Sequence, residues 1–351
     1  MNRYREMMER LPVPEGQAER LKGRVLAAEP GKKRRAYRPR SLGKKILLAA
    51  VLAGLLTATV GAAAELVPWD ALFVERFGAA AADSPAAESV FQNVDVTSVC
   101  GDVTLTVRQA LGDEKTLYLL LDYQLPEGTD VELVQAVWED RKGPAVNVRL
   151  YSGAVDWADI EGMSSREAMR TLAGENLGFS GSVETVEFDA GSRTMTILAI
   201  CSFSDKVPLR KPMTVLAWEP SVEWEGEWVD LANYAAVAAF QPSYTARAKE
   251  GHKRADGVTY TVELTPLSIK VENAGDREET LYTMWQLRQK IVLVYQDGTE
   301  VPIRDFSPTG GGGKGYSGNR YYESCELLLK KLVDTSQVRA VRVGALEIPV
   351  S

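Results

Sequence analysis

A run of 19 residues without a charge, residues 46–64, is the feature that most restricts how this chain can fold. As a helix with a rise of about 1.5 Å per residue it would be roughly 29 Å long, which matches a hydrocarbon core of about 30 Å. A helix in a soluble core does not need so long an apolar stretch. The run therefore predicts one transmembrane helix over residues 46–64, in a single-pass membrane protein.

The charges on either side of this run predict its orientation. Residues 1–45 hold 14 Lys and Arg against 5 Asp and Glu, whereas the rest of the chain holds 27 against 43. Basic segments stay on the cytoplasmic side, so we expect a cytoplasmic N-terminus and an extracellular C-terminal region in the cell membrane. A cleaved signal peptide is the alternative, because residues 62–64 satisfy the small-residue rule, but the 45-residue leader is too long for one.

Two short amphipathic helices are predicted within the cytoplasmic segment, residues 1–45. Pro12 and Pro14 separate them, because proline cannot continue a helix. Helices of this size cannot bury a core alone, so they are either loosely ordered or completed by a partner protein. Their apolar positions are the candidate partner-binding residues: Met7, Met8, Leu11, Leu21, Val25 and Leu26.

The basic run at residues 32–40 lies directly before the predicted span. It contains Pro39 and a single aromatic residue, Tyr37. Orientation in the membrane and contact with anionic lipid explain such a run better than direct binding of nucleic acid. We therefore expect membrane lipid, and no nucleic acid, among the partners.

Residues 65–88 are predicted to form a juxtamembrane helix and a connector. Trp69, Phe73 and Phe77 recur every four residues, which is the spacing of one helix face. The helix could lie at the outer membrane interface or pack on the first folded domain, and the spacing fits both.

Strand patterns dominate from residue 89 onward. Residues 103–107 alternate with a period of two, residues 117–123 are nearly all apolar, and Gly112-Asp113-Glu114 supplies a turn between them, which predicts a hairpin. Residues 291–295 and 300–304 flank a second turn and predict another hairpin.

Short strands at this spacing predict two exported β-sandwich domains of the immunoglobulin-like type, residues 89–245 and 246–351. A capping box at residues 164–167 predicts one helix within the first of them. The expected fold class is thus mainly β, with short cytoplasmic helices and one transmembrane helix before the two sandwiches.

The sequence contains no recognisable catalytic constellation. The single histidine, His252, lies in a polar linker and excludes the usual triads and multi-histidine metal sites. The glycine run at residues 310–313 lacks the Ser or Thr of a phosphate loop after Lys314, so we expect a flexible hairpin loop there. We expect no catalytic residues, no metal and no cofactor, and hence no enzyme.

The three cysteines all lie in the acidic region. A disulfide between Cys100 and Cys201 is possible in an oxidising exterior, but buried free thiols are favoured because cysteine is among the most buried residue types.

A possible ligand surface lies where Trp218, Trp224 and Trp228 alternate with acidic residues. Aromatic and acidic groups on one surface could bind a cationic peptide, a sugar or calcium. The alternative, which the pattern favours, is an amphipathic strand pair with the tryptophans inward and the carboxylates in water.

The opening MNRYREMM, the basic stretch, the predicted span and the segment VTLTVRQALGDEKTLYLLLDYQLPEG at residues 103–128 together resemble a known family. It is a Gram-positive bacterial family of single-pass membrane proteins with a domain of unknown function in the exported region. The specific part of the resemblance is the hairpin around Leu111-Gly112-Asp113-Glu114.

Many members of this family look like membrane-bound anti-sigma factors. The resemblance implies an envelope-signalling protein whose cytoplasmic segment binds a sigma factor and whose exported region senses an unknown extracellular ligand. The alternative is a non-signalling cell-envelope module, anchored at its N-terminus, that binds polysaccharide, peptide or protein. An exported hydrolase is the third hypothesis.

Overall fold

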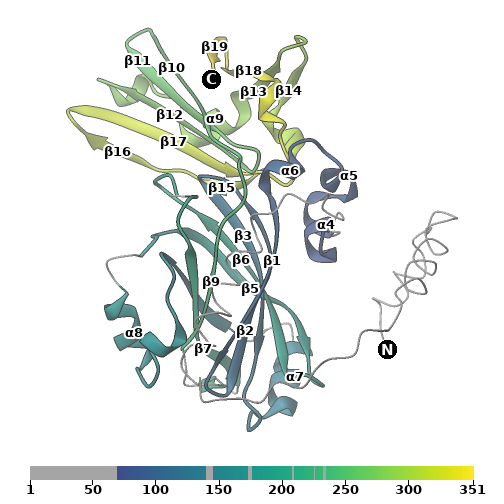
Figure 1. Ribbon diagram of the computed structural model, residues 1–351. Coiled ribbons are helices and arrows are strands. Elements are labelled where there is room, and N and C mark those ends of the chain that lie inside the picture. The colour runs from purple at the N-terminus through teal and green to yellow at the C-terminus, as the bar shows by residue number, and fades with distance from the viewer. Residues whose placement is uncertain (1–68, 140–144, 173–175, 208, 225, 232–234) are drawn as a thin grey trace, which may run out of the picture. The chain divides into compact units, whose positions relative to one another are not determined.

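Antiparallel β-sheets make up most of the described chain (Figure 1). The structure, a computed structural model, describes residues 69–139, 145–172, 176–207, 209–224, 226–231 and 235–351. The cytoplasmic segment at residues 1–45 and the span at residues 46–64, both predicted above, lie outside these residues. All described residues belong to one compact unit.

Two sheets are formed by strands that precede residue 246. The first large sheet has the order β1-β2-β3-β6-β5, and the first small sheet has the order β4-β7-β8 with β9 also on β7. Their strands are β1 (Phe91–Cys100), β2 (Val103–Gly112), β3 (Thr116–Gln124), β4 (Ala145–Ser152), β5 (Ser180–Asp189), β6 (Thr194–Ser202), β7 (Met213–Trp224), β8 (Glu227–Asp230) and β9 (Ala235–Phe240).

Two further sheets are formed by the strands that follow. The second large sheet has the order β10-β11-β12-β17-β15 with β16 also on β17, and the second small sheet has the order β14-β13-β18-β19. Their strands are β10 (Lys249–Ala255), β11 (Val258–Leu264), β12 (Ser268–Gly275), β13 (Ile291–Tyr295), β14 (Glu300–Pro302), β15 (Thr309–Gly311), β16 (Lys314–Ser317), β17 (Arg320–Leu328), β18 (Val338–Val343) and β19 (Leu346–Pro349).

The α-helices of the described residues are short, from four to nine residues. They are α4 (Ala71–Phe77), α5 (Ala79–Ala82), α6 (Ala87–Val90), α7 (Val131–Glu139), α8 (Ser165–Thr171) and α9 (Met284–Lys290). Ser164 caps α8 through the predicted capping box, in which its hydroxyl accepts from the Glu167 amide and Glu167 bonds back to Ser164.

The first large sheet is buried on both faces in its middle. On β3, Leu119 and Leu121 join the core shared with the first small sheet, whereas Tyr118 and Leu120 join a second apolar cluster on the opposite face. Burial on both faces explains why β3 reads as an almost continuous apolar run in the sequence. Leu267, from the later half of the chain, is completely buried in the second cluster.

The membrane-spanning part of the predicted fold class needs correction. No helix in the described part of the chain is long and apolar enough to cross a membrane, and the predicted span itself lies outside that part. About 20 apolar residues are needed for a helical span, more than twice the nine of α7. The structure supports a mainly β chain and does not support the transmembrane helix or the single-pass membrane description.

The immunoglobulin-like topology is also wrong. An immunoglobulin domain divides its strands as ABED and CFG, so no three consecutive strands are neighbours in one sheet. Here β1-β2-β3 and β10-β11-β12 are each three consecutive neighbours. Tight turns such as the one at Gly101 keep successive strands paired, because they leave no length for a crossover to the other sheet.

Several local predictions are confirmed. The hairpin of β2 and β3 pairs Leu111 with Tyr118, and β13 pairs with β14 through Leu293 and Val301. The boundary predicted at residue 245 stays a prediction, although the strands of each described sheet come from one side of it.

Candidate functional site

The predicted sigma-binding residues lie outside the described part of the chain. They are Met7, Met8, Leu11, Leu21, Val25 and Leu26, all within residues 1–68. Their role therefore stays a prediction.

The tryptophans of the predicted ligand surface do not share one environment. Trp218 is buried in the first core, where the Arg149 guanidinium lies 5.6 Å from its ring centroid. Trp228 on β8 is 63% exposed and pairs across the hairpin with Glu223. The side chain of Trp224 lies outside the described residues. Trp228 is thus the described tryptophan of this set that a ligand could reach.

An open groove of about 170 Å³ lies beside the strand that carries Trp228. It is lined by Pro126, Gly128, Thr129, Asp130, Leu133, Val229, Asp230 and Leu231. The Thr129 hydroxyl donates to the Leu231 carbonyl at 3.4 Å, and Asp130 accepts from the Leu133 amide at 3.0 Å at the start of α7. The two acidic residues of its lining, Asp130 and Asp230, favour a small cationic group.

The groove was missed from the sequence because its two walls lie about 100 residues apart. One wall is the loop between β3 and α7, and the other is β8. The polar Pro126 to Asp130 segment reads as an ordinary turn, and its nearness to Asp230 follows only from the tertiary fold.

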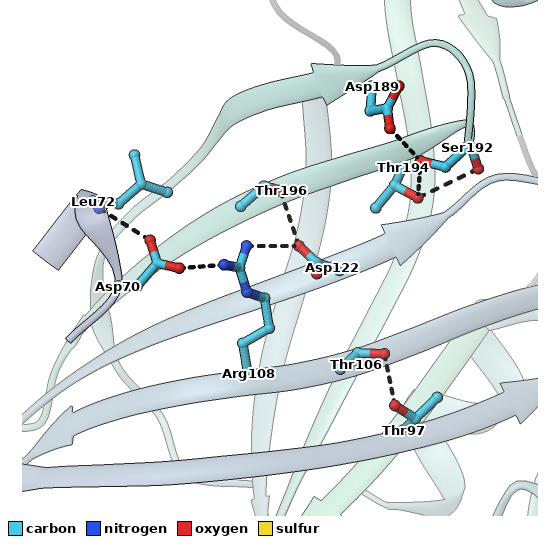
Figure 2. A network of polar contacts seen from close by, with 10 residues as sticks. All are labelled: Asp70, Leu72, Thr97, Thr106, Arg108, Asp122, Asp189, Ser192, Thr194 and Thr196. Atoms are coloured by element: carbon cyan, nitrogen blue, oxygen red, sulfur yellow. Dashed lines mark hydrogen bonds and ion pairs between the residues drawn. The ribbon is translucent and has the colours of Figure 1, made fainter. Parts of the chain in front are cut away.

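A polar network fixes α4 to the outer face of the first large sheet (Figure 2). Arg108 on β2 forms ion pairs with Asp70 and with Asp122, the latter at 3.4 Å. Asp70 caps α4 by accepting from the Leu72 amide at 3.0 Å, and the Thr196 hydroxyl donates to Asp122 at 2.9 Å. One arginine therefore joins the start of α4 to the strand next to its own.

Aromatic side chains also hold α4 on the sheet. The Phe77 ring meets the Tyr118 ring edge to face with centroids 5.2 Å apart, and Trp69 meets Phe77 at 6.1 Å. Phe73 is completely buried in the same cluster. Burial raises the pKa of Tyr118 to about 12, while the Arg76 guanidinium 5.1 Å from its ring lowers it. Of the two alternatives left open by the sequence, the structure therefore supports the one in which this helix packs on the folded region.

The turn between β2 and β3 forms a joint with the second pair of sheets. The Lys115 ammonium lies 3.0 Å from a Glu263 carboxylate oxygen on β11 and donates to the Ser204 carbonyl at 2.9 Å. Glu114 accepts from the Ala248 amide at 3.1 Å. The motif that carries the family resemblance therefore connects the two pairs of sheets.

Asp113 is the buried centre of this joint. Its carboxylate accepts from the amides of Lys115 at 2.7 Å and Thr116 at 2.8 Å. Burial raises the pKa of Asp113 from 3.8 to about 6, although the Thr265 side chain and these two amides lower it.

Gly112 is required beside Asp113 by the close approach of an aromatic ring. A Cβ atom at this position would lie 2.6 Å from the Tyr244 ring, closer than van der Waals contact allows. The adjoining cavity, lined by Lys115, Glu263 and Thr265 among others, has a volume of about 10 Å³. It has room for about one water molecule and none for a substrate.

The cysteines are free, buried thiols, and no disulfide joins Cys100 to Cys201. Burial raises the pKa of Cys201, and it raises that of Cys325 to about 11. Thiols with raised pKa values are poor nucleophiles, because the thiolate is the reactive form.

His252 and the glycine run take other places than predicted. His252 is exposed on β10 instead of in a linker, and the glycine run belongs to β15 and the segment leading to β16 instead of to a flexible loop. Within the described ranges, no group of three or more His, Cys, Asp or Glu residues could hold a metal ion.

Comparison with known proteins gives little that bears on these sites. No family model matches the chain, and no curated protein matches it. A solved structure titled "The crystal structure of the conserved domain protein from Bacillus anthracis" is similar over 78% of this chain and 83% of its own, with 10% sequence identity and a TM-score of 0.41. We therefore base the function on the residues of the chain itself.

Proposed function

We propose that this chain is a non-catalytic signalling protein of the anti-sigma type, related to the Gram-positive family that its sequence resembles. Residues 1–45 bind a sigma factor, and the β-rich region recognises a ligand or condition. The division between a basic segment and an acidic remainder supports two kinds of partner for the two parts of the chain.

The observation that carries this proposal is the double attachment of α4 to the first large sheet. Arg108 holds Asp70 at the start of the helix, and Phe73 and Phe77 are buried on its inner face. A helix held to the sheet at two points follows a rearrangement of the sheet, which an unattached helix would not do.

The proposal is tested by co-purifying the full chain with each alternative sigma factor of the host. We expect one of them to bind in stoichiometric amount. Leu21→Asp combined with Val25→Asp should reduce binding at least about 100-fold, because it introduces charges into a desolvated apolar interface. Arg20→Asp is the matched control, since it changes the charge by the same amount on the predicted opposite face and should reduce binding much less.

Two results would count against the anti-sigma proposal. One is the absence of any bound sigma factor, and the other is normal binding by the Leu21/Val25 variant together with loss in the Arg20 variant. Either result favours the second candidate function, a binding module without a signalling role.

The groove beside Trp228 is the observation that favours this second candidate. It is open, and it is lined by Asp130 and Asp230. Such a groove would take a basic side chain of a peptide or an amine-bearing ligand whether or not residues 1–45 bind a partner.

A further inference from the structure

The outer edge of the second large sheet is a continuous strip of backbone. β15 pairs Gly311 with Glu326, and β16 pairs Lys314 with Glu323, so both strands follow β17 in one unbroken register. Between them, the Gly313 carbonyl accepts from the Ser324 amide at 2.8 Å, and the Gly313 amide donates to the Ser324 hydroxyl at 3.1 Å. Residues 309–317 therefore form one edge nine residues long.

Alternate residues of this edge present their backbone groups to solvent. Gly313 hydrogen-bonds to β17. The N–H and C=O groups of the residues directly before and after it therefore point away from β17, as do those of every second residue from there. These outward residues are Gly310, Gly312, Lys314 and Tyr316, and all four are exposed. The edge thus offers an unpaired row of donors and acceptors to another strand.

Close packing explains the glycines on this edge. A Cβ atom on Gly312 would lie 1.9 Å from the Ser324 carbonyl oxygen and 2.8 Å from Cγ of Met284 in α9. A Cβ atom on Gly310 would lie 2.2 Å from the Glu326 carbonyl oxygen. Glycine is therefore needed at these two positions, because a Cβ atom would clash with β17. The edge consequently carries no side chain there that could block a further strand.

Other sheet edges carry features that discourage a further strand. β10 has a row of charged residues, and the backbone of Glu250 already pairs with Ser351. β14 has three residues and ends in Pro302, while β5 has a bulge beside Glu187. Charge, proline and bulges are the usual protection of sheet edges, and of these the edge at residues 309–317 has the single charge of Lys314.

We propose that this edge pairs with the same edge of a second copy of the chain, antiparallel and about a two-fold axis at Gly313. In this register Tyr316 lies opposite Gly310 of the second copy and Lys314 lies opposite its Gly312, so every outward backbone group finds a partner. The part of the edge that carries side chains, residues 314–317, thus faces the glycine-rich part of the second copy, and the Tyr316 ring covers its Gly310.

Neighbouring registers are less favourable. An axis at Lys314 would set the two lysines opposite each other, and an axis at Gly312 would leave Tyr316 opposite Pro308, which has no N–H to donate. Tyr316 is 60% exposed and Trp285 is 63% exposed. Trp285 directly follows Met284, whose Cγ lies beside Gly312. Large apolar side chains beside an open edge suit burial by a second copy.

Cysteine cross-linking of the full chain tests both the pairing and its register. Two copies of Gly313 would face each other as a non-hydrogen-bonded pair, with Cα atoms about 4.5 Å apart, which is within disulfide range. A Cβ atom on Gly313 has room, with its nearest neighbour at 3.8 Å, and the three native cysteines are buried. Under mild oxidation Gly313→Cys should form covalent dimers.

Gly311→Cys is the matched control for this experiment. A Cβ atom there meets nothing within 4 Å, but the proposed register sets Gly311 opposite Gly315 and far from its own copy. We expect it to cross-link at least about tenfold more slowly than Gly313→Cys. Equal rates for the two variants, or no dimer from Gly313→Cys, would overturn the proposal.

A second measurement does not depend on oxidation. Sedimentation of the unmodified chain should show a monomer–dimer equilibrium that Lys314→Pro abolishes, because proline removes an outward N–H and leaves the inward bonds intact. Lys314→Ala keeps the N–H and loses only the ion pair with Glu278, so it should still dimerise. A monomer at every concentration, or a dimer unaffected by Lys314→Pro, contradicts the proposal, which is independent of sigma-factor binding.

Discussion

Asp113 takes part both in the turn between β2 and β3 and in the contact between the two pairs of sheets. Its carboxylate is held by the amides of Lys115 and Thr116, as in many turns that begin with aspartate. The sequence predicts that role, because Gly112-Asp113-Glu114 stands between two strand patterns. The burial of Asp113 could not be predicted in the same way, since it depends on Tyr244 and Thr265 from distant parts of the chain.

Burial of Asp113 predicts a pH dependence of stability. Its pKa is about 6 in the folded chain and near 3.8 when unfolded, so the folded state binds more protons between these values. The free energy of unfolding should therefore fall as the pH rises from about 4 to about 6, by up to roughly 3 kcal/mol from this group. Urea titrations of Asp113→Asn should lack this fall, because the amide stays neutral and keeps an acceptor oxygen for the two N–H groups.

Asp297→Asn provides a control of opposite sign for the same titrations. The Thr299 amide lowers the pKa of the exposed Asp297, so its contribution is stabilising above that pKa and is lost as the pH falls. Removing this carboxylate should leave the fall between pH 4 and pH 6 in place. If the stability of the wild type relative to Asp113→Asn does not fall as the pH rises through that window, the account of Asp113 is wrong.

Elements with strong local signals were predictable from the sequence, and those formed by tertiary contact were not. β2, β3 and β11 alternate or run apolar, and the helix at α8 has its capping box. β9 is rich in alanine and β15 in glycine, residues with low strand propensity, and both are strands because a neighbour pairs with them. The aromatic spacing predicted helix α4, but it did not indicate whether the helix packs on the folded region or lies at a membrane interface.

The attachment of α4 should depend strongly on Phe73. This side chain is completely buried among Trp69, Phe77 and Tyr118, so Phe73→Ala should lower the free energy of unfolding by about 3–5 kcal/mol. Amide exchange of residues 71–77 should also become faster. Glu75→Ala, on the exposed face of the same helix, should change stability by no more than about 0.5 kcal/mol. Similar effects of the two substitutions would show that α4 is not packed as described.

At the scale of the whole chain, one apolar cluster connects parts that the sequence divides. Tyr118 and Leu198 come from the first pair of sheets, and Ala246 and Leu267 come from beyond residue 245. The ion pair of Lys115 with Glu263 and the bond from Ser202 to Glu326 cross the same boundary. Composition and strand spacing suggested two sandwiches, but they contain no information about whether the two share a core.

A shared core predicts that both pairs of sheets unfold together. Calorimetry of the wild-type chain should give a single transition for the β-rich region, because exposing either pair also exposes the cluster around Leu267. Leu267→Ala removes a completely buried side chain and should cost about 2–5 kcal/mol, enough to separate the transition into two. Lys206→Ala breaks an ion pair with Glu250 whose side chains are 46% and 54% exposed, and it should leave the single transition unchanged. Two separate transitions in the wild type, or a larger effect of Lys206→Ala than of Leu267→Ala, would mean that the two pairs of sheets are energetically independent.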